Sequence, residues 1–181
     1  MNPYTLDEIR SAIPAQHKRF ADYLRGLPLA TFLGSLGNTW SPLQHMQHLM
    51  NSEAALAGFI GARKFLPLQT PAASKNYNEV IAVYRAALEA TPIPNNPFPP
   101  PEYGSLDALE ATRGLALGEF LKGGDLLVEA TRSCSDAELD AFQGRHPLLG
   151  KMSLREFLLF SVYHVEHHQI ALEKRLGQVA L

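Results

Sequence analysis

Four capping boxes, in which a Ser or Thr precedes a Glu or Gln by three residues, constrain the fold more than any other feature of this sequence. They begin at Thr5, Ser41, Ser135 and Ser153. In a capping box the hydroxyl accepts a hydrogen bond from the backbone N–H three residues on, and the Glu or Gln reaches back to the backbone N–H of the capping residue. Pro42 adds the residue that is favoured at the first helical position. The pattern therefore predicts four helix starts.

The apolar periodicity after these starts predicts long helices, and strand-like alternation is almost absent. We expect helices over 6–25, 41–66, 76–90, 105–131 and 153–177, with a short helix near 136–142. The segment 91–104 contains six prolines, which exclude a helix or a central strand and predict an extended crossover. Such a long connection can also cover a site. The sequence thus predicts an all-α fold: a four-helix bundle with a long Pro-rich crossover and short extra helices, as one domain over 1–181.

The composition is that of a soluble globular protein without an evident surface for nucleic acid. Hydrophobic residues make up 46% and charged residues 19%, and the formal net charge is -2 with no cluster of Lys and Arg. No apolar run approaches the ~18 residues that cross a bilayer, so no membrane partner is expected. The first residues lack the pattern of a secretory signal. Cys134, the single cysteine, is expected to be an ordinary free thiol in a reducing cytoplasm.

Histidines gather in two of the predicted helices. His164, His167 and His168 lie within five residues, and His45 and His48 lie near the start of the second long helix. His164 and His168 are about 40° apart around a helix, and such an i, i+4 pair can bind one metal ion. A facing helix would supply a third ligand, and its apolar periodicity favours His45 over His48 as the inward residue. The alternative is that the histidines are polar core residues.

Three segments together are similar to known proteins: WSPLQHMQHLMNSE, HPLLGKMSL and YHVEHHQIAL. They resemble the DinB-like branch of the DinB/YfiT-like superfamily of metal-binding four-helix bundles. The first motif of that family places a histidine eight residues after a tryptophan, then a Leu, and a Glu five residues beyond the histidine. The corresponding residues here are Trp40, His48, Leu49 and Glu53.

The second motif of the family is His-x-x-His-His, whose first and last histidines are ligands and correspond to His164 and His168. The resemblance therefore implies that His48, His164 and His168 bind the metal, against the preference of the periodicity for His45. The sequence departs from the family at Gln44, where many relatives carry Glu.

Other residues are assigned supporting roles. His45, Glu53 and His167 are candidates for positions that orient the ligands. For Glu53, a solvated or helix-paired carboxylate remains equally open. Trp40 is expected to pack as an apolar anchor before the helix, with stacking on a substrate as the alternative.

Two further histidines lie outside the motifs. His17 is expected to be exposed or to make a lone polar contact, and His146 to be a structural histidine of a loop.

Three neutral histidines leave metal positions open, as in catalytic sites. The resemblance implies a metal-dependent enzyme with a small-molecule substrate. Its metal would be a divalent transition metal, with zinc and nickel as the preferred candidates. The enzyme would be a hydrolase or a transferase that uses a low-molecular-weight thiol. The resemblance is also compatible with a homodimer. The alternative function is a non-catalytic bundle that binds a small ligand or partner, with the histidines as polar core.

Overall fold

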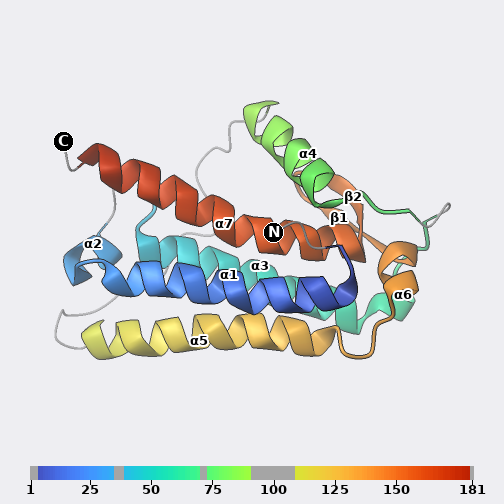
Figure 1. Ribbon diagram of the computed structural model, residues 1–181, viewed down its shortest axis with the longest axis horizontal. Helices are drawn as coiled ribbons and strands as arrows, with labels where there is room; N and C mark the ends of the chain where they lie inside the picture. Colours follow the sequence, from blue (N-terminus) through green and yellow to red (C-terminus); the bar gives the residue numbers. More distant parts are fainter. Residues whose placement is uncertain (1–3, 35–38, 70–72, 91–108, 180–181) are drawn as a thin grey trace.

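The computed structural model describes residues 4–34, 39–69, 73–90 and 109–179, which form helices and one short hairpin (Figure 1). The elements are α1 (Leu6–Gly26), α2 (Leu29–Leu33), α3 (Pro42–Gly61), η1 (Arg63–Phe65), α4 (Tyr77–Ala90), α5 (Leu109–Ala130), α6 (Asp136–Ala141), β1 (Gln143–His146), β2 (Gly150–Ser153) and α7 (Leu154–Val179). The predicted all-α class and four-helix bundle are confirmed. Across these four ranges, no helix has the length and apolar character that a membrane span requires.

The four long helices α1, α3, α5 and α7 lie side by side. α1 and α3 each pack against both α5 and α7, so the four helices form the corners of a square. In Figure 1, α1 and α7 run in one direction and α3 and α5 in the other. Because α3 and α5 are parallel, the connection from the end of α3 to the start of α5 must span the length of the bundle. This connection includes α4, which packs on α7. The arrangement is that of a bundle with one long crossover.

The helix starts follow the capping boxes. The side chains of Thr5, Ser41 and Ser135 each accept from the backbone N–H of the third helical residue, and the backbone N–H of each capping residue donates to the side chain of that third residue. At α7, Ser153 Oγ accepts from the backbone N–H of Glu156 at 3.1 Å, and Glu156 Oε2 accepts from the Ser153 N–H at 3.1 Å. The local hydrogen-bond chemistry of these residues therefore sets where the helices begin.

Some elements differ from the predictions. The helix expected over 41–66 ends at Gly61 and continues as the 3₁₀ turn η1. Neither α2 nor the β1–β2 hairpin was predicted. The two strands have four residues each, too few for an alternating pattern to be recognised. Gly150, at φ +73°, provides the left-handed conformation where β2 begins. The predicted crossover over 91–104 lies outside the described residues.

Two apolar clusters fill the bundle and meet along α7. Leu158, Leu159 and Tyr163 belong to one cluster, and Val165 and Leu172 belong to the other. The histidines of α7 lie where the two clusters meet, so the candidate site is enclosed by packed side chains.

Candidate metal site

Three histidines from two helices converge on one point. α3 contributes His48, and α7 contributes His164 and His168 from successive turns of the same face. The Nε2 atom of His164 lies 3.2 Å from Nε2 of His48 and 3.0 Å from Nε2 of His168. One nitrogen of each ring lies within 4.8 Å of the other two. The structure thus brings together the three histidines that the resemblance implied as ligands.

These separations suit a metal ion. Nitrogen ligands at about 2.0–2.1 Å from a tetrahedral zinc are roughly 3.3–3.4 Å apart. The two Nε2 separations of 3.2 and 3.0 Å are slightly smaller, so a small outward rotation of the rings would admit an ion between them. The three-histidine cluster is therefore compatible with metal binding.

The three histidine rings are held uncharged, as coordination of a metal requires. Burial, with the neighbouring histidines as a smaller cause, holds the pKa of His164 and of His168 well below the ordinary value. Burial also lowers the pKa of His48. At neutral pH the three imidazoles are therefore uncharged, and each carries one nitrogen lone pair, on Nδ1 or on Nε2.

Aromatic rings surround the cluster. The Trp40 ring lies parallel to His168, with centroids 6.3 Å apart and planes at 5°, and Phe160 stacks on His164 at 4.7 Å. Tyr84 of α4 meets His164 edge-on at 6.2 Å. Apolar walls of this kind lower the local dielectric, which strengthens electrostatic interactions with a bound ion. Trp40 packs before α3 as predicted, and its ring contacts the histidines.

His45 lies directly behind the cluster. Its ring is 6% exposed, and its Nδ1 atom lies 2.6 Å from Nδ1 of His168. Burial, followed by the charge of Arg175, lowers the pKa of His45 to about 3. The periodicity was therefore right that His45 points inward, while His48 is the residue of α3 that joins the group of three.

His167 flanks the cluster. It is half-buried, and its ring contacts Tyr84 at 5.2 Å, Tyr163 at 6.1 Å and His168 at 5.4 Å. Burial lowers its pKa, with the charge of Arg85 as a second cause. His167 therefore lies on the flank of the cluster, and its role in orienting a ligand stays a prediction.

Glu53 and His17 differ from their predictions. Glu53 is 4% exposed rather than solvated, and its Oε2 lies 2.9 Å from Nε2 of His17 instead of bonding to a ligand candidate. His17 is 1% exposed, and its Nδ1 bonds to the Ile13 carbonyl at 2.8 Å. The expectation that His17 is exposed or makes a lone contact is wrong, because α1 buries the ring against α3 and α5. The adjacent Gly123 and Gly124, inside a predicted helix, were the available indication of a close approach.

His146 and Cys134 have no part in the cluster. The Nδ1 atom of His146 accepts from the backbone N–H groups of Leu148 and Leu149, each at 3.1 Å, so this histidine shapes the hairpin turn. It belongs to β1 rather than to a loop. Cys134 is buried, and burial raises the pKa of its thiol, as expected for an unreactive cysteine.

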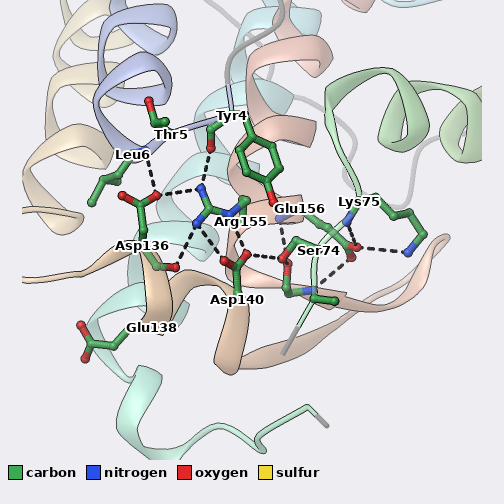
Figure 2. A network of polar contacts seen from close by, with 12 residues as sticks. Tyr4, Thr5, Leu6, Ser74, Lys75, Asp136, Glu138, Asp140, Arg155 and Glu156 are labelled. Atoms are coloured by element: carbon green, nitrogen blue, oxygen red, sulfur yellow. Dashed lines mark hydrogen bonds and ion pairs between the residues drawn. The ribbon is translucent and has the colours of Figure 1, made fainter. Parts of the chain in front are cut away.

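Sequence reasoning also missed a buried arginine. Arg155, 2% exposed, binds both carboxylate oxygens of Asp140, at 2.6 and 3.0 Å (Figure 2). It donates as well to the backbone carbonyls of Tyr4 and Asp136. This network joins the start of the chain and α6 to the first turn of α7, away from the histidines.

A comparison with known protein families identifies the family of this chain. The model of the DinB superfamily matches residues 12–171. Among solved structures, the chain is similar to the crystal structure of TT2238, a four-helix bundle protein, at 20% identity and a TM-score of 0.49, over 94% of this chain and 99% of that chain. No curated protein matches it significantly. Because the family model covers most of its length, the chain belongs to the DinB superfamily.

Proposed function

We propose that His48, His164 and His168 bind one divalent transition metal, zinc or nickel, in a cytoplasmic enzyme that acts on a small molecule. The enzyme would be a hydrolase or a transferase that uses a low-molecular-weight thiol. The observation that carries the proposal is the convergence of the three histidines: Nε2 of His164 lies 3.2 Å from Nε2 of His48 and 3.0 Å from Nε2 of His168, close to the separation of imidazoles around a tetrahedral ion.

The donor set favours an open and strongly charged site. Three ligands leave at least one position for substrate, whereas structural zinc is normally closed by four. Within the described part of the chain, no carboxylate joins the three-histidine group, so the ligands themselves carry no negative charge. A bound ion would attract an anionic group and lower the pKa of a thiol or water in the open position.

The surrounding residues limit what can enter. The rings of Trp40, Phe160 and Tyr84 lie against the histidines and would limit the contact of bulk water with a bound ion. Sulfur is a softer ligand than oxygen and suits zinc and nickel. These features support the thiol-dependent reaction in particular.

Metal analysis of protein purified without a nickel column tests the site. His48→Ala, His164→Ala and His168→Ala should each weaken zinc binding by more than the roughly 10–100-fold that loss of a supporting hydrogen bond costs. As a control, His146→Asn, at a half-buried histidine outside the group of three, should leave the affinity unchanged. Retention of full metal content by all three alanine variants after dialysis would contradict the proposal.

Cobalt-loaded protein tests the thiol. Addition of glutathione or cysteine should produce a sulfur-to-cobalt absorption band in wild-type protein, and the band should be lost in His164→Ala. If saturating thiol leaves the cobalt spectrum unchanged, the thiol reaction is excluded and hydrolysis remains.

A further inference from the structure

The two nitrogens of His168 face different partners. Nε2 lies 3.0 Å from Nε2 of His164, inside the group of three, and Nδ1 lies 2.6 Å from Nδ1 of His45, outside it. Both rings are more than nine-tenths buried, at 8% exposure for His168 and 6% for His45. Water therefore has little access to the Nδ1 contact, and the two rings must satisfy each other.

The proton on this contact decides whether His168 can bind a metal. A neutral imidazole carries one proton, on either Nδ1 or Nε2. If His168 donates from Nδ1 to His45, its Nε2 lone pair faces the other two rings. If His45 donates instead, the proton of His168 lies on Nε2, where a metal would have to bind. Only the first arrangement is compatible with coordination.

His45 has no competing task. In the described residues its Nδ1 atom bonds to His168, and its Nε2 atom is buried without a hydrogen-bond partner. His45 lies in the first turn of α3, where its backbone N–H donates to the Ser41 carbonyl, and its ring packs edge-on against Trp40 at 5.3 Å. The ring thus places its Nδ1 atom against Nδ1 of His168.

We infer that His45 is a positioning residue whose Nδ1 accepts a hydrogen bond from Nδ1–H of His168, which leaves the lone pair of His168 on Nε2, toward the metal position. The inference rests on the proposed three-histidine site. Such supporting partners fix the tautomer and orientation of a ligand and increase its basicity. Within the described part of the chain, His168 is the ligand candidate whose second ring nitrogen bonds to a side chain.

Two variants of His45 separate the hydrogen bond from the volume of the ring. His45→Leu removes the acceptor and should weaken zinc binding by about 10–100-fold in a chelator competition. His45→Asn places an amide oxygen near the position of Nδ1 and should retain most of the affinity. Thermal unfolding of both metal-free variants reports on folding.

The His168→Ala background provides the matched control. Because His45 is proposed to act through His168, His45→Leu should cause no further loss of affinity in that background. An equal loss with and without His168 would reveal a packing effect and overturn the inference. The inference would also fail if the single His45→Leu variant bound zinc as tightly as wild type. Wild-type protein that binds no zinc would instead overturn the proposed function, and this role with it.

Histidine nitrogen NMR of the zinc-loaded wild type gives a reading that needs no variant. His168 should carry its proton on Nδ1, and His45 should carry its proton on Nε2. Observation of the proton of His45 on Nδ1 would contradict the inference even if every variant had lost affinity.

Discussion

The buried pair of His17 and Glu53 is a charged interaction in a largely apolar part of the bundle. Burial acts to lower the pKa of His17, but the hydrogen bond and charge of Glu53 outweigh it, and the net pKa is raised. The second oxygen of Glu53, Oε1, is buried without a partner in the described residues. The pair therefore depends on the proton that His17 carries.

The raised pKa of His17 predicts a dependence of stability on pH. Its contribution to the free energy of unfolding is complete below the unfolded pKa of about 6.5 and is lost as pH rises through the higher folded value. Glu53→Gln should remove this loss, so the curves of wild type and variant should converge toward alkaline pH. Denaturant unfolding between pH 6 and pH 9 measures the difference. A constant difference across this range would show that His17 does not titrate with a raised pKa.

At the scale of the elements, α5 approaches α1 closely at one glycine. A Cβ atom at Gly124 would lie 2.8 Å from Cγ of His17, too close for two carbon atoms without movement. Glycine inside a helix costs roughly 0.5–1 kcal/mol relative to alanine. The packing of the His17 ring against α5, where it also stacks on Phe120 at 4.6 Å, offsets that cost.

Two glycines of the same helix should therefore respond in opposite directions to alanine. Gly124→Ala should destabilise the protein by about 1–3 kcal/mol, because the added methyl group displaces His17. Gly118→Ala, where nothing lies within 4 Å of the new Cβ, should stabilise it by up to about 1 kcal/mol. Denaturant unfolding of the two variants makes the comparison. A gain in stability for both would mean that α1 and α5 are farther apart than described.

At the scale of the whole molecule, Arg155 connects segments that are distant in sequence. Its bonds to Asp140 and to the backbone of Tyr4 hold α6 and the start of the chain on α7 (Figure 2). α7 in turn packs against α1, α3 and α4. Arg155 therefore anchors the first turn of α7 to α6 and to Tyr4. The histidines lie farther along the same helix.

Removal of this anchor should affect the whole fold. Arg155→Met should lower the free energy of unfolding by on the order of 3 kcal/mol, because the partly buried Asp140 loses its counter-charge. Arg132→Met removes an ion pair with Glu129 in which both side chains are more than half exposed, and it should change stability by less than about 0.5 kcal/mol. Equal effects of the two variants would contradict the anchoring role.

Local chemistry explains how far the sequence could predict this molecule. The capping residues Thr5, Ser41, Ser135 and Ser153 determine helix starts through bonds three residues away, which a sequence reveals. The pair of His164 and His168 follows from the helical repeat in the same way.

Contacts between helices could not be predicted in this way. Whether His45 or His48 completes the group depends on the rotation of α3 against α7, and family resemblance rather than periodicity indicated His48. The pairing of His17 with Glu53 depends on the approach of three helices, which no single segment encodes. The hairpin that contains His146 is too short for a periodic pattern to be recognised.

The ring of Trp40 against His168 has a practical consequence. The chain contains a single tryptophan, so selective excitation of indole reports on one position, next to the cluster, without any label. Paramagnetic ions such as nickel or cobalt quench a nearby excited indole, whereas zinc does not. The emission of the unmodified protein can therefore follow the arrival of an ion in real time and distinguish the two kinds of metal.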